Sequence, residues 1–139
     1  MLNPLVDLKE LVSVKPYVLD MDDSRPLSDG KTIWERFLDS SAERAKDQII
    51  EWGFTYPESN PTSQFLSAEV LLVKADIVEE FGFQESLDAE QIQVGGQGGE
   101  SRRYKKFSVE ERGEKAKVFR DKAYKTLAGK NASVYPGVE

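Results

Sequence analysis

The stretch that decides the fold is residues 60–82, NPTSQFLSAEVLLVKADIVEEFG. Its apolar residues recur so densely that they cover almost the whole circumference of a helix, which predicts a helix buried by neighbours on several sides. Asn60 is expected to cap this helix, Pro61 suits its first position, and Gly82 ends it. A central strand through Val70–Val73 is the competing interpretation, but a pattern this long favours a helix. The stretch is therefore predicted to form the centre of the core.

An amphipathic helix is predicted before it, from Lys31 to Trp52. Its apolar residues recur at three- and four-residue steps and make one stripe, so both tryptophans are expected in the core. Asp29 is a plausible N-cap, and Gly53 can close the helix in the left-handed conformation. The stripe consists of Ile33, Trp34, Phe37, Leu38, Ala42, Ala45, Ile49 and Trp52.

Two further helices are indicated near the ends of the sequence. Ser108–Ala128 opens with a capping-box pattern, in which Ser108 and Glu111 each satisfy a backbone N–H. A narrow apolar stripe follows, surrounded by lysines. Leu5–Val14 suggests a short helix that Pro16 ends. The stripe of the last helix is Ala116, Phe119, Ala123 and Leu127.

Between the last two long helices, Gln91–Ser101 alternates polar and apolar residues and then contains four glycines. This pattern is typical of a short edge strand followed by a hinge, so we expect a projecting arm that becomes ordered only against a neighbouring subunit. The residues expected to make contacts between subunits are Ile92, Val94, Gly95, Gly96, Gly98 and Gly99.

The 139 residues are thus predicted to form a single, mainly α domain, because this length is typical of one core. It would be a small bundle of three to four helices with a protruding glycine-rich arm or short strand between the last two. The expected parts are a short helix and loop (1–28), the core helices (29–82), an extended arm (83–107), a basic helix (108–130) and a tail (131–139).

The composition excludes several classes of function. The chain has no cysteine and no histidine, which removes the usual zinc ligands, the commonest general base and the nucleophiles that depend on them. We therefore expect no metal, no cofactor and no catalysis. The longest apolar run, Val70–Val73, is far too short to span a membrane. Because charges interrupt the first ten residues, no signal peptide is expected, and synthesis inside the cell follows.

The charge is distributed unevenly. Between Ser101 and Lys130 lie eleven basic and four acidic residues, which leaves eight basic and twenty-one acidic residues elsewhere, so the two parts carry +7 and −13. Such a molecule can present its acidic body and its basic region to different partners, including another copy of itself. The candidates for contact with a partner protein or DNA are Arg102, Arg103, Tyr104, Lys105, Lys106, Arg112, Lys115, Lys122 and Lys125.

The order of these features resembles the small head–tail connector (adaptor) proteins of tailed viruses. In that family a short helix, an amphipathic helix and an apolar helix ending near a glycine precede a glycine-containing extended segment and a final helix. The segment Ile92-Gln93-Val94-Gly95-Gly96 is the closest local match, and the strongly basic region Arg102–Lys125 is a departure from the family's pattern.

The resemblance implies a ring of about twelve copies at the head–tail junction of the virion, made in the host cytoplasm. Such a ring would dock on the portal protein, extend the DNA channel and present a platform to the next neck or tail protein. We expect the basic helix to dock on the portal, because dense lysines lining a channel would grip the DNA that passes through it.

Two other interpretations belong to different classes. In the first, the chain is a small helical nucleic-acid-binding or regulatory protein whose region 102–125 contacts phosphates, with aromatic residues between its cations stacking on bases. In the second it is an enzyme, which would require a concave pocket with convergent carboxylates around Asp76 and Glu79.

Overall fold

The computed structural model describes residues 1–86 and 103–129. Within these ranges the chain is mainly helical with one two-stranded antiparallel sheet, so the predicted fold class is confirmed. The elements are α1 (Leu5–Leu11), the 3₁₀ helix η1 (Pro16–Leu19), α2 (Ile33–Glu51), α3 (Ser63–Phe81), β1 (Phe83–Ser86), β2 (Arg103–Lys106) and α5 (Val109–Ala128).

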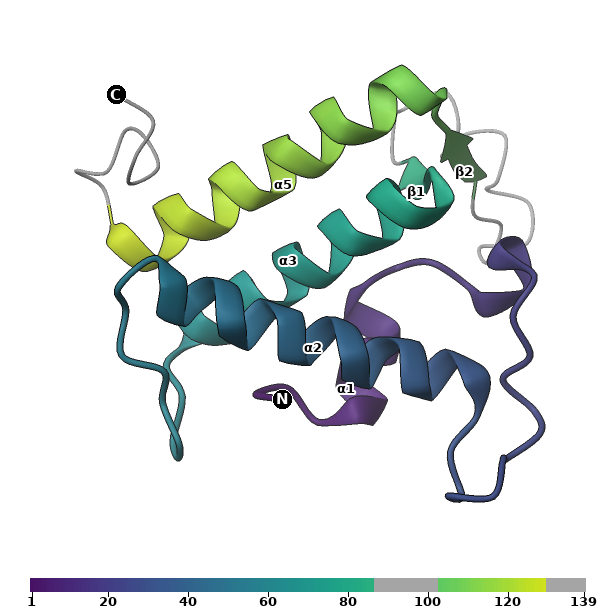
Figure 1. Cartoon of the computed structure of the whole chain (residues 1–139), viewed down its shortest axis with the longest axis horizontal. Helices are drawn as coiled ribbons and strands as arrows, with labels where there is room; N and C mark the ends of the chain where they lie inside the picture. Colours follow the sequence, from purple (N-terminus) through teal and green to yellow (C-terminus); the bar gives the residue numbers. More distant parts are fainter. Residues whose placement is uncertain (87–102, 130–139) are drawn as a thin grey trace, which may run out of the picture.

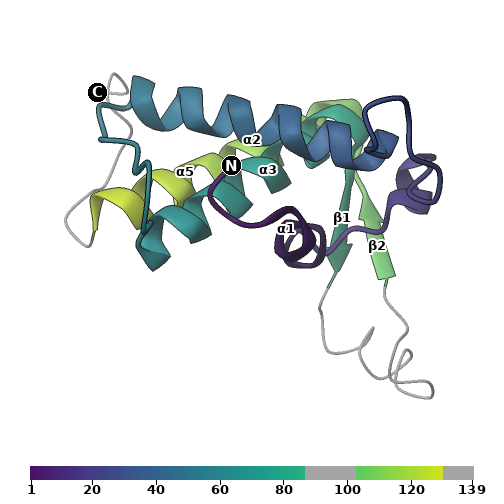
Figure 2. The ribbon, with the colours of Figure 1, turned by 90° about the horizontal axis from the view of Figure 1, so that it is seen from below.

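The pairing of α3 with α5 is the most extensive contact between helices. The two helices lie side by side and run in opposite directions, while α2 lies on one side of the pair (Figures 1 and 2). Four alanines are fully buried in this pair: Ala68, Ala75, Ala116 and Ala123. Their small side chains allow the two helices to approach each other closely. The basic helix is therefore part of the core.

Two clusters of buried side chains make up that core, and α3 contributes to both. Val73 and Ile77 belong to a cluster with Trp34 and Leu38 of α2. Ala68 and Leu72 belong to a second cluster that also contains residues of α2 and α5. The prediction that residues 60–82 supply the centre of the core is confirmed.

The predicted N-caps of α2 and α3 are wrong by three and two residues. Thr32, not Asp29, caps α2, and it forms a capping box with Glu35. The carboxylate of Asp29 instead accepts hydrogen bonds from Lys31 and Arg36. The N-cap of α3 is Thr62, because the residue expected there, Asn60, has a φ of 50° where a helix cap needs extended backbone.

The start of α5 and the end of α3 depend only on nearby residues, and both agree with the prediction. α5 begins with the expected capping box of Ser108 and Glu111. Gly82 ends α3 with a φ of 76°, in the left-handed region. The first helix is shorter than predicted, because α1 ends at Leu11 and Ser13 has a φ of 61°.

β1 and β2 form the root of a hairpin between α3 and α5. Phe83 is paired with Lys106 and Ser86 with Arg103, and the N–H of Phe107 donates to the carbonyl oxygen of Gly82 over 2.7 Å. The strands extend on the side of the α3–α5 pair that faces away from α2 (Figure 2). The strand expected at 91–94 lies outside the described residues, as do the proposed arm contacts at Ile92, Val94, Gly95, Gly96, Gly98 and Gly99.

A buried carboxylate that the sequence did not reveal joins the N-terminal residues to α3. Glu69 is 1% exposed. It accepts hydrogen bonds from the backbone N–H of Leu2 (2.6 Å), the backbone N–H of Asn3 (2.8 Å) and the side-chain amide of Asn3 (2.9 Å). A buried charge must be paired or well hydrogen-bonded to be tolerated, and these three donors satisfy that condition.

Candidate functional site

The aromatic residues of the basic region face the protein interior. Phe107 is 2% exposed, and Tyr104 packs against the core cluster that contains Trp34. The hydroxyl of Tyr104 accepts a hydrogen bond from the backbone N–H of Lys15 over 3.2 Å. In this conformation Phe107 is buried and Tyr104 is partly buried, so stacking of these rings on bases stays a prediction.

Arg112 is also turned toward the body of the protein. Its guanidinium lies against Gly82, where a Cβ atom would come within 2.6 Å of Nε. Nε is buried and finds no hydrogen-bond acceptor within the described residues. Arg112 therefore packs against the end of α3, and this guanidinium is a poor candidate for an external contact.

The lysines at the root of the hairpin are arranged around two phenylalanines. Lys105 and Lys115 place Nζ at 5.2 and 5.7 Å from the ring centroid of Phe107. Lys106 places Nζ at 5.7 Å from the ring centroid of Phe83, its partner in the sheet. These distances suit cation–π contacts, which leave an ammonium group accessible while its stem packs on a ring.

The remaining candidates for contact with a partner lie on α5, on β2 and outside the described residues. Lys122 and Lys125 are exposed on α5. Arg103 is placed by the sheet register opposite Ser86, and Arg102 lies outside the described residues. The structure thus brings Lys105, Lys106 and Lys115 together at the root of the hairpin, but it places Lys122 and Lys125 farther along α5.

An apolar cleft of about 210 Å³ lies at the junction of the hairpin with the helices. The segment after α1, the middle of α3, β1 and α5 all contribute to its walls. One lysine, Lys74, lines it as well. The apolar lining consists of Val12, Val14, Ile77, Val78, Phe83 and Phe119.

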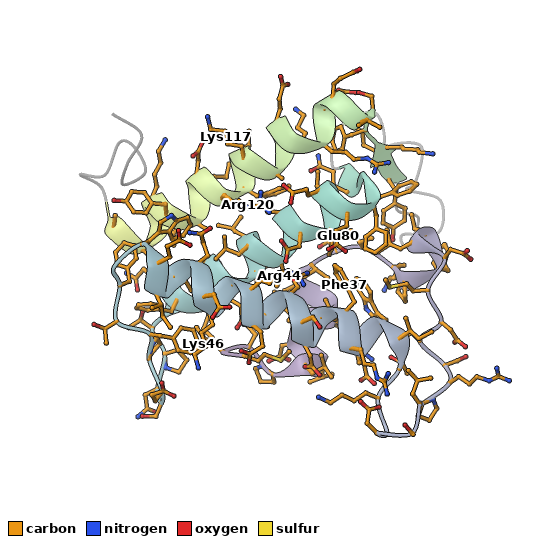
Figure 3. All side chains as sticks on the ribbon, viewed as in Figure 1. Phe37, Arg44, Lys46, Glu80, Lys117 and Arg120 are labelled. Atoms are coloured by element: carbon orange, nitrogen blue, oxygen red, sulfur yellow. The ribbon has the colours of Figure 1, made fainter. Side chains whose placement is uncertain are left out.

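A second hollow, of about 390 Å³, lies where α2, α3 and α5 meet and contains the charged residues that an enzyme would need. Arg120 contacts Glu79 over 2.7 Å and Asp76 over 3.3 Å. Arg44 contacts Asp76 over 3.1 Å and Glu80 over 3.7 Å. Figure 3 shows Arg44, Glu80 and Arg120 gathered between the three helices.

The electrostatics of this ion-pair cluster favour cross-linking of the helices over acid–base chemistry. The hydrogen bond from Arg120 holds the pKa of Glu79 below its ordinary value, and Glu79 in turn raises the pKa of Arg120. A general acid needs the opposite, a raised carboxyl pKa. Asp76 also accepts a hydrogen bond from the hydroxyl of Ser41 over 2.5 Å. The carboxylates do converge around Asp76 and Glu79, but each of these two forms an ion pair with an arginine.

In the part of the chain that the structure describes, no three acidic side chains are placed to hold a metal ion. In the same part, no helix is both long and apolar enough to cross a membrane.

Comparison with known proteins provides no relative. The chain matches no family model, no curated protein and no solved structure. Its function has to be argued from its own geometry and charges.

Proposed function

We propose that the chain is a structural connector protein of a tailed virus. Copies of it assemble into a ring at the head–tail junction, dock on the portal protein and continue the DNA channel toward the neck or tail. In this role the protein binds other macromolecules and catalyses no reaction.

The observation that carries the proposal is the hairpin between α3 and α5. Its strands leave the helical body on the side away from α2 (Figure 2). β1 directly follows α3 and β2 precedes α5, and these two helices make the most extensive helix–helix contact. The order of elements, with a short helix, two long helices, an extended element and a final helix, is the order that the resemblance to connectors implied. An extended element projecting from a rigid body is suited to pairing with a neighbouring subunit.

The charges support a binding role rather than catalysis. The convergent carboxylates of the ion-pair cluster pair with arginines of two other helices. Lys105 and Lys106 at the root of the hairpin are exposed. Separated charges of opposite sign are what a head-to-tail interface between identical subunits requires.

Measuring the mass of the purified full chain, alone and with the portal ring of the same virus, tests this proposal. We expect a ring on the portal template, visible as one large species by native mass spectrometry and as rings by electron microscopy. A chain that remains a monomer with the portal contradicts the proposal.

A DNA titration across a range of salt concentrations separates the connector from the nucleic-acid-binding alternative. A protein that neutralises several phosphates loses affinity steeply as salt rises. The connector proposal expects weak binding by the monomer. Tight, strongly salt-dependent binding to duplex DNA by a monomer that never assembles would establish the alternative.

A further inference from the structure

The outer face of α2 carries acidic residues that form no ion pair within the described part of the chain. Glu43, Asp47 and Glu51 are all exposed and follow one another at four-residue steps, so they lie close together along one side of the helix. None of the three forms an ion pair with any residue in 1–86 or 103–129. Like charges at this spacing destabilise a helix. We call these three residues the acidic stripe.

Cations that are near α2 in sequence are engaged elsewhere. Lys31 pairs with Asp39, and Arg36 pairs with Asp29. Arg44 turns inward to Asp76. Lys46 places Nζ 5.1 Å from the ring centroid of Tyr56, and Figure 3 shows it on a different side of α2 from Arg44. None of these four cations therefore pairs with the acidic stripe.

An apolar side chain lies beside the acidic stripe. Ile50 is 50% exposed. It is three residues after Asp47 and seven after Glu43, so it shares the outer face with them. Glu43 and Asp47 border this side chain on one side, and Lys46, whose Nζ lies over the ring of Tyr56, is its neighbour on the other.

The cleft at the root of the hairpin is complementary to this outer face of α2, because it is apolar and has lysines near it. Its walls are apolar, and lysines surround it. Lys74 lines the cleft itself. Lys115 and Lys122 lie four residues before and three residues after Phe119, so they flank the point where that ring enters the cleft. Lys15 is exposed and follows directly on Val14 of the lining.

The two surfaces face different ways. α2 lies on one side of the α3–α5 pair, and the hairpin whose root bounds the cleft extends on the other (Figure 2). Two complementary surfaces on different sides of one subunit cannot meet within that subunit. They can meet between copies, in a head-to-tail contact that generates a ring when its rotation closes.

We propose that the outer face of α2 in one copy docks over the lysine-bordered cleft of the next copy. Ile50 enters the apolar cleft, and the acidic stripe lies against Lys115 and Lys122. This contact rests on the proposed function, since it supplies the interface of the connector ring. Duplex DNA does not fit the same α2 surface, because carboxylates repel phosphates.

Disulfide cross-linking tests the contact directly, because the chain has no cysteine of its own. The double variant Ile50→Cys/Gln84→Cys places one thiol on the outer face of α2 and one at the cleft, which Gln84 lines. A disulfide forms only when the two Cα atoms come within about 7 Å. A short bismaleimide, used in parallel, tolerates a less exact fit.

The expected result is a ladder of trimers and larger species from the double variant. Each single variant can give dimers at most, since a head-to-tail chain needs both thiols in every copy. If the double variant gives nothing beyond dimers with either reagent, the proposed contact is wrong. Circular dichroism of all three variants verifies that each one is folded.

Charge reversal in the double-cysteine variant tests whether opposite charges contribute to the proposed contact. Adding Glu43→Lys and Asp47→Lys should slow cross-linking at low ionic strength by about tenfold, the lower end of what steering contributes. Adding Lys115→Glu and Lys122→Glu as well should restore the rate. The matched control is Lys125→Glu, which changes the same helix away from the cleft and should leave the rate unchanged. An unaltered rate after the first reversal overturns this pairing of surfaces.

The outcomes separate this contact from the ring itself. Rings seen by electron microscopy without the ladder would leave the connector proposal standing and reject the α2–cleft contact. A ladder that forms open chains and no ring on the portal would do the reverse.

Discussion

Two sets of acidic residues on neighbouring helices have opposite surroundings. Asp76 and Glu79 of α3 face arginines from α2 and α5, whereas Glu43 and Asp47 of α2 face solvent with no partner among the described residues. The paired set holds three helices together. The unpaired set contributes nothing to the fold and, by mutual repulsion, weakens the helix that carries it. The proposed contact between copies would give this unpaired set its cationic partners.

The largest effect is expected at Glu69, the most deeply buried carboxylate of α3. Replacing Glu69 by Ala leaves two backbone N–H groups and the amide of Asn3 without their acceptor, which should lower the free energy of unfolding by about 3 kcal/mol. Urea denaturation measures this loss in the free energy of unfolding. Glu43→Ala is the matched control on the outer face, and it should change stability by less than about 0.5 kcal/mol. Equal losses in the two variants would contradict the distinction drawn between inner and outer carboxylates.

A smaller effect concerns the pH dependence of the ion-pair cluster. Arg120 holds the pKa of Glu79 below its ordinary value of 4.5, so the stabilisation is fully present above pH 4.5 and is lost as the pH falls through the lowered value. We expect the stability difference between the wild type and Glu79→Gln to shrink as the pH is lowered from about 6 to about 3. Denaturation curves across this range measure it.

The control for this pH dependence is the same comparison in an Arg120→Gln background. Without the guanidinium, the effect of Glu79→Gln should lose its pH dependence. If the dependence persists there, Arg120 is not its cause.

The smallest effect has the opposite sign. Asp47→Asn removes both four-residue repulsions of the acidic stripe, with Glu43 and with Glu51, and should stabilise the isolated subunit by about 0.5 kcal/mol at low salt. At about 1 M salt the gain should disappear, because exposed charges are then screened. The midpoint of thermal unfolding at the two salt concentrations measures it. A destabilised Asp47→Asn variant would show that the stripe has a structural role.

Features that depend on nearby residues could be predicted from the sequence. The capping box of Ser108 and Glu111 and the left-handed Gly82 need only a few adjacent residues, and both were found. The start of α2 was misplaced because Asp29 and Thr32 are both good caps. Only the observed backbone shows that Thr32 forms the box while Asp29 caps a turn.

Features that depend on distant residues could not be predicted. Glu69 looks like one polar residue on an apolar helix, and its donors lie 66 and 67 positions earlier. The ion-pair cluster joins Arg44, Asp76 and Arg120 over 32 and 44 positions, without a local signal. The basic residues were recognised as a group, but the sequence did not show that Tyr104 and Phe107 face inward.

The way the hairpin is attached has a mechanical consequence. Gly82 and Phe107 hold the root of the strands together through a 2.7 Å hydrogen bond, and each strand continues one helix of the α3–α5 pair with almost no linker. A load on Ser86 and Arg103 is thus shared by α3 and α5, which pack against each other through their buried alanines. The α3–α5 pair can therefore transmit a force from β1 and β2 along the length of both helices.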